Sequence, residues 1–203
     1  MNSEQNILKL LKEKSSTKQK VYKITQDAFS QMQEILSAKA KRLNTAVSDT
    51  NVSISYEESG DFDAKLRFSG DTLLFHMHTN IFDFPSSHQI HSTSYVEEDK
   101  TRSFCGLINI YNFLSDSLKY NRLNDVGFLI ARIFINKDNH FFVDGDKELG
   151  FLFNDFVNQR IDMEHMENII NCAMHYSLNF DLETPDLNDV RMVSVHEILD
   201  INN

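Results

Sequence analysis

The chain has 203 residues, enough to bury one proper core, and its apolar and charged fractions of 41% and 25% are those of a globular protein. No stretch approaches the roughly 18 consecutive apolar residues of a membrane span, and a net charge of −10 disfavours nucleic-acid binding, which needs a basic surface. The first residues lack the apolar core of a secretion signal, so we expect a cytoplasmic protein without a membrane partner.

Charge is distributed unevenly along the chain. Residues 1–43 hold nine Lys and Arg against four Asp and Glu, whereas the chain from Asp144 onward holds thirteen acids and three bases. We therefore divide the sequence into a flexible basic N-terminal segment (1–16), a single domain (17–180) and an acidic C-terminal tail (181–203).

The first half of the domain reads as a helix followed by three strands. Apolar residues recur at helical spacing from Thr17 to about Asn44, with lysines and acids on the opposite side. Apolar and polar residues then alternate over 52–57 and 64–69, and a longer run follows over 72–82. Gly-containing turns join these runs, which predicts an antiparallel meander.

The second half is less regular. Residues 83–102 are expected to be irregular, with one strand near Ile90–Val96, and a helix is predicted over 104–119 with Ser103 as its N-cap. Next comes a predicted β-hairpin with strands over 126–136 and 140–144. Residues 146–158 fit either a helix or a strand. Asp162 is expected to cap a last helix that runs to about residue 180. The fold class is α+β: an antiparallel sheet of about five strands, packed with three or more helices in the order α-βββ-α-ββ-α.

This order resembles the type III secretion chaperone-like fold, which the YbjN-type family of bacterial proteins shares. The segment LINIYNFLSDSLKYNRLNDVGFLIARIFINKDNHFFVDG looks like that family's helix and hairpin, and DMEHMENIINCAMHYSLNF looks like its closing helix. The likeness covers roughly residues 18–180; the loop at 83–102 is longer than the family leads us to expect, and the tail after Asp181 has no counterpart in it. It implies a non-catalytic, often dimeric protein that binds another polypeptide, and no catalytic residues or cofactor.

Four histidines lie close together in the sequence. On a strand, His76 and His78 would share a face, and His88 and His91 could complete a site for zinc, nickel or iron from the loop. A metal-binding protein or metal-dependent enzyme is therefore the alternative function.

The run at 128–135 is apolar in both of its alternating sets. Phe128, Ile130 and Phe134 fall on one face together with Arg132, and an equally apolar set falls on the other. A strand of this kind needs cover on both sides, from its own chain or from a partner. We therefore expect a non-enzymatic, homodimeric protein-binding domain whose partner contacts Phe128, Ile130, Arg132 and Phe134.

Overall fold

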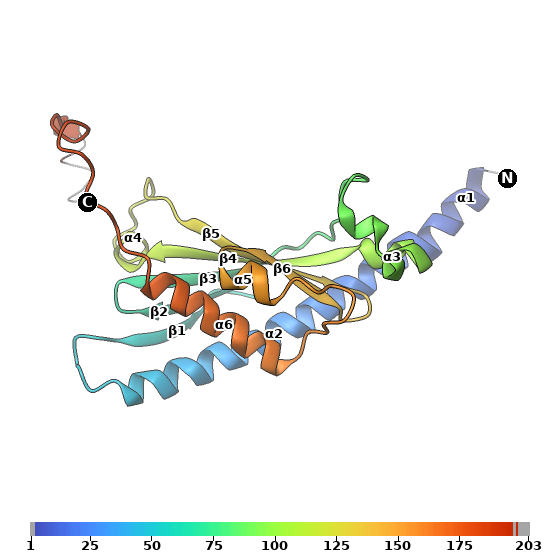
Figure 1. The fold of residues 1–203 in the computed structure, drawn as a ribbon, viewed down its shortest axis with the longest axis horizontal. Helices are drawn as coiled ribbons and strands as arrows, with labels where there is room; N and C mark the ends of the chain where they lie inside the picture. Colours follow the sequence, from blue (N-terminus) through green and yellow to red (C-terminus); the bar gives the residue numbers. More distant parts are fainter. Residues whose placement is uncertain (1–2, 197, 199–203) are drawn as a thin grey trace.

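The computed structural model describes residues 3–196 and 198, and it has two layers, a six-stranded antiparallel sheet and a pair of helices packed against one face of it (Figure 1). Each strand pairs with the next one in the sequence, so the sheet order is β1-β2-β3-β4-β5-β6. The strands are β1 (Ile54–Glu58), β2 (Asp63–Phe68), β3 (Asp71–Met77), β4 (Cys105–Leu114), β5 (Phe128–Asn136) and β6 (Phe141–Gly145). The predicted α+β class and the antiparallel sheet are confirmed, with six strands in place of about five.

The helices differ greatly in length. A first helix, α1 (Ser3–Leu10), continues through one π-helical segment, η1 (Leu11–Ser15), into the long α2 (Ser16–Ala46), and α6 (Met163–Leu178) lies beside α2 (Figure 1). The remaining helices are single turns: η2 (Gln89–Ser92), α3 (Ser94–Glu98), η3 (Lys100–Ser103), α4 (Ser115–Lys119) and α5 (Glu148–Leu152). Of the helices in the described part of the chain, none has both the length and the apolar character that crossing a lipid bilayer requires.

The main core lies between the sheet and the α2–α6 pair. Helical spacing places one apolar stripe of each helix against the alternating residues of the strands, as in the row Phe75, Ile110 and Ala131 across β3, β4 and β5. The side chain of Asp162 accepts a hydrogen bond from the backbone N–H of His165, which confirms the predicted cap of α6. Burial of each large apolar side chain in this layer stabilises the fold by about 1.5–3 kcal/mol.

Two predicted elements are wrong. Residues 104–119 were expected to be a helix, but Cys105–Leu114 form β4, a central strand, and only Ser115–Lys119 are helical. The strand expected near Ile90–Val96 is replaced by the short helices η2 and α3. The ambiguous residues 146–158 contain one helical turn, α5.

Candidate functional site: a cleft on the open face of the sheet

The face of the sheet opposite α2 and α6, here called the open face, is covered at one end by residues 82–103. This segment connects β3 to β4, and Phe82 starts it with a pair of backbone hydrogen bonds to Cys105, of 2.8 and 2.9 Å. It then folds over the ends of β4, β5 and β6 and forms a second apolar cluster, separate from the main core. The cluster consists of Phe82, Phe84, Ile90, Tyr95, Val96, Cys105, Leu107, Phe134, Phe142 and Phe156.

Charged contacts attach this segment to the β5–β6 hairpin. Arg102 donates from Nε to Asp138 at 3.2 Å, and its guanidinium group lies 4.3 Å from the centroid of the Tyr95 ring. Lys137 donates to the Asp99 carboxylate, and this hydrogen bond is the largest cause of a pKa of about 2 for Asp99. Burial raises the pKa of the Tyr95 phenol to about 12. The segment is therefore an integral part of the fold, so the surface that it forms is present before any partner binds.

Between this segment and the strands lies a cleft of about 620 Å³. Its apolar wall is an aromatic cluster: the rings of Phe134 and Phe142 are stacked with centroids 4.9 Å apart, and the ring of Phe84 lies 5.1 Å from Phe134 and 5.7 Å from Phe142. The full lining is Phe82, Asp83, Phe84, Pro85, His88, Gln89, Leu107, Arg132, Phe134, Phe142, Val143, Asp144, Gly145, Gly150 and Asn154.

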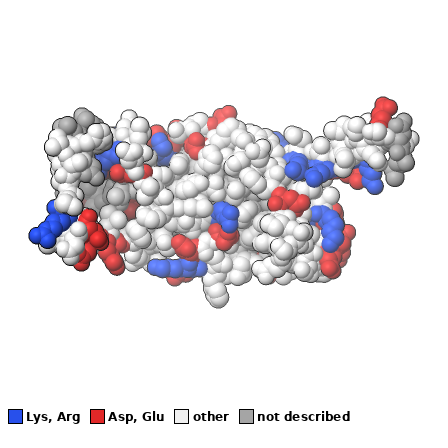
Figure 2. Space-filling view, turned by 90° about the horizontal axis from the view of Figure 1, so that it is seen from above, with Lys and Arg blue, Asp and Glu red and all other residues white. Residues whose placement is uncertain are grey.

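One ion pair also lines the cleft. Arg132 on β5 donates from Nε to the Asp144 carboxylate on β6 at 3.1 Å, and the guanidinium carbon lies 5.5 Å from the Phe134 ring centroid. Both side chains are about half exposed, at 45% and 54%. Seen from above, the open face is mostly uncharged in its middle, with a few scattered charged groups (Figure 2). The site therefore combines an aromatic surface with one accessible ion pair.

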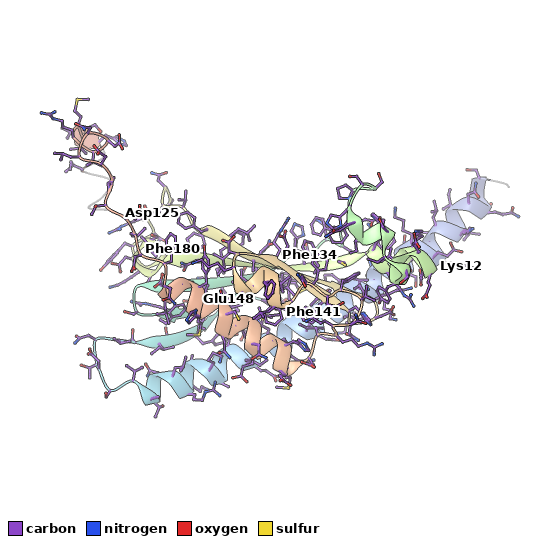
Figure 3. All side chains as sticks on the ribbon, viewed as in Figure 1. Lys12, Asp125, Phe134, Phe141, Glu148 and Phe180 are labelled. Atoms are coloured by element: carbon purple, nitrogen blue, oxygen red, sulfur yellow. The ribbon has the colours of Figure 1, made fainter. Side chains whose placement is uncertain are left out.

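The four residues that the sequence assigned to one partner-binding face do not share a face. A β-bulge shifts the register so that Ile110 pairs with Ala131 and Tyr111 with Leu129, which leaves Ile130 as the extra residue. Ile130 is buried in the main core, and the ring of Phe128 lies 5.4 Å from that of Phe180, just after α6. Only Arg132 and Phe134 reach the cleft; Figure 3 shows Phe134 and the core residue Phe141 on opposite sides of the sheet.

The four candidate metal ligands are engaged separately. His76 contacts Asp63 at 2.7 Å, and His91 contacts the backbone oxygen of Phe84 at 3.1 Å. His78 and His88 each accept a hydrogen bond from a backbone N–H two residues further along the chain. The rings of His76 and His78 lie 6.4 Å apart, and within residues 3–196 and 198 no three His, Cys, Asp or Glu side chains are grouped as metal ligands would be. The loop therefore does not complete a site around the His76–His78 pair.

Three residues of the cleft, Phe84, Phe142 and Asp144, were not predicted from the sequence. Phe142 and Asp144 alternate with the core residues Phe141 and Val143 on β6, so they lie on the opposite face of the sheet, together with Phe134. The alternation along β6 could therefore have identified them. Phe84 lies in the irregular segment, where no periodicity indicates which way a side chain points.

Comparison of the chain with protein-family models, with curated proteins and with solved structures finds no match.

Proposed function

We propose that this protein is a non-enzymatic protein-binding domain, chaperone-like or regulatory, which holds an apolar segment of another polypeptide in the cleft of the open face. The observation that supports this proposal is the preformed aromatic wall of Phe84, Phe134 and Phe142 beside the accessible Arg132–Asp144 pair. Aromatic residues and Arg are enriched where proteins bind one another, especially in pockets that receive an anchor side chain.

The dimensions and charge of the cleft define its occupant. A volume of about 620 Å³ lies within the range of about 300–1,000 Å³ that is usual for ligand sites, which is room for a few side chains of a bound segment. Apolar or aromatic side chains would pack against the phenylalanine rings. The net charge of −10 favours neutral or basic residues on either side of them, because acidic neighbours would be repelled.

Blocking the cleft without disturbing the fold tests this proposal. Asn154 lines the cleft and is exposed, so Asn154→Trp places a large ring at the cleft and changes stability by no more than about 0.5 kcal/mol. Glu148→Trp on α5, labelled in Figure 3, is the matched control, because Glu148 is also exposed but is not among the residues that line the cleft.

The probe is a library of random 12-residue peptides displayed on phage. We expect the wild-type protein and the Glu148→Trp variant to select the same apolar-rich peptides, and the Asn154→Trp variant to bind them at least tenfold more weakly. Equal binding of the selected peptides by both variants would place the binding surface elsewhere. Failure of the wild type to select any peptide would contradict the proposal itself.

A further inference from the structure

The N-terminal helix presents an exposed apolar face on a basic segment. Four large apolar residues of α1 and η1 are each about half exposed: Ile7 (54%), Leu8 (48%), Leu10 (58%) and Leu11 (54%). None of the residues 3–15 is buried, and this part of the helix projects from the body, with the Lys14 ammonium group 5.6 Å from the centroid of the Phe104 ring (Figure 1). Residues 3–20 carry five Lys and two Glu.

The C-terminal tail has the complementary properties. After α6 ends at Leu178, the chain leaves the body, and residues 181–196 carry four acids and one Arg. The large apolar side chains of residues 181–196 are more than half exposed, among them Leu187 (76%), Met192 (92%) and Val195 (77%). Exposed apolar residues at this density are characteristic of a binding segment rather than a solvated linker.

The two segments lie at opposite ends of the elongated molecule. Figure 3 labels Lys12 on the projecting helix at one end and Phe180, at the base of the tail, at the other. They therefore do not meet within one chain as it is folded, although their charges are opposite and both expose apolar side chains.

We propose that the acidic tail of one copy binds the basic, apolar face of the N-terminal helix of a second copy. When two copies lie antiparallel, a two-fold axis relates them, and each tail then reaches the partner's helix, so the pair closes with two identical contacts. Lysines flank the leucines of the helix, and in the tail acids flank Leu182 and Leu187, so packing and charge attraction act together.

The lengths of the two segments agree. Residues 3–15 span about 20 Å at the helical rise of about 1.5 Å per residue. The tail from Leu187 to Val195 spans up to about 30 Å when extended, at about 3.3 Å per residue, and less when it coils. One tail can therefore cover the whole exposed face of one helix.

The experiment uses two full-length variants that each remove one of the surfaces. The helix variant carries Leu8→Glu and Leu11→Glu, and the tail variant carries Met192→Asp and Val193→Asp; all four positions are exposed, so the folded domain is retained. Sedimentation velocity is measured for the wild type, for each variant alone, and for their equimolar mixture. In the mixture, the intact tail of the helix variant can bind the intact helix of the tail variant.

We expect the wild type to sediment as a dimer, each variant alone to dissociate at least tenfold more readily, and the mixture to form a 1:1 complex. We also expect the wild-type dimer to weaken as the salt concentration rises, because the charges lie at the surface. A monomeric wild type overturns the proposal, as does a tail variant that still dimerises, which would mean that two helices pair with each other. A mixture that stays monomeric overturns it too. Peptide binding in the cleft is independent of these outcomes, since none of the four positions lines it.

Discussion

The substitution Gly106→Ala tests the packing of α2 across the sheet. Gly106 lies on β4, directly under Thr25, which is fully buried on α2 and donates from its hydroxyl to the backbone oxygen of Val21 at 2.9 Å. A Cβ atom at position 106 would lie 1.9 Å from Oγ1, 2.7 Å from Cβ and 2.8 Å from Cγ2 of Thr25. Rotating the Thr25 side chain does not relieve the contact with its own Cβ, so α2 must move away from the sheet.

Overpacking of this kind costs about 1–3 kcal/mol, and we expect the upper half of this range because a 31-residue helix must shift. For a domain of this size, a loss of about 2–3 kcal/mol corresponds to a fall of about 4–12 °C in Tm, at about 2–4 °C per kcal/mol. Urea unfolding monitored by circular dichroism measures the free energy of unfolding. If its slope against urea concentration is the same for the wild type and Gly106→Ala, both proteins unfold from the same compact state.

Gly70→Ala is the control, since a Cβ atom there meets nothing within 4 Å, and it should change stability by less than about 0.5 kcal/mol. Thr25→Gly should partly rescue Gly106→Ala, with a coupling of about 0.5–3 kcal/mol in a double-mutant cycle. If Gly106→Ala is no more harmful than Gly70→Ala, α2 does not pack on β4 at this point and the layer arrangement is incorrect.

Four further predictions follow from burial and charge. Ile130→Glu and Phe134→Glu should each lower the free energy of unfolding in urea by several kcal/mol, because both side chains are buried within their own chain. An unchanged unfolding midpoint would contradict this burial. The pKa of Asp99 is lowered to about 2, so the ionised carboxylate stabilises the fold above its unfolded pKa of about 3.9, and this stabilisation is lost as pH falls from about 4 to 2. The free energy of unfolding of Asp99→Asn should therefore fall less steeply than that of the wild type between pH 4 and 2. An equal fall in the variant and the wild type would refute this. Deleting residues 1–11 should leave the Tm within a few degrees of the wild-type value, because none of the residues described there is buried; a fall of more than about 10 °C would make the segment structural. Elemental analysis of protein purified without chelator should find no stoichiometric zinc, nickel or iron, and bound metal that His76→Ala or His78→Ala removes would establish the alternative function.

The helices at 17–44 and 162–180 and the strands β1 and β2 were predictable because each has one face that is exposed to solvent. Where polar residues occupy one side, as in β2, the period of the apolar pattern identifies the element. The apolar pattern did not identify β4 as a strand, because β4 lies in the middle of the sheet and Leu107 and Ile108 are buried on its opposite faces. With both faces apolar, its residues also fit a helical spacing, and only the neighbouring strands decide between the two.

The candidate site could be predicted only in part for a related reason. Arg132 and Phe134 follow the strict alternation of a strand, but the bulge at Ile130 depends on how β5 pairs with β4, which a single sequence does not encode locally. The contribution of Phe84 depends on residues 82–103 folding back over β6, held by side chains such as Arg102 and Asp138 that are far apart in the sequence. Tertiary contacts, rather than local pattern, bring the cleft together.

Whether the cleft binds a polypeptide can be measured by mapping backbone amide chemical shifts while a phage-selected peptide is titrated into ¹⁵N-labelled protein. If the cleft holds the peptide, the largest changes should occur at Phe84, Arg132 and Phe142 and at their neighbours along β5 and β6, and they should be lost in Asn154→Trp. Changes confined to α2, α6 or the β1 edge would contradict the account, because the binding surface would then lie on the other side of the sheet or at its edge.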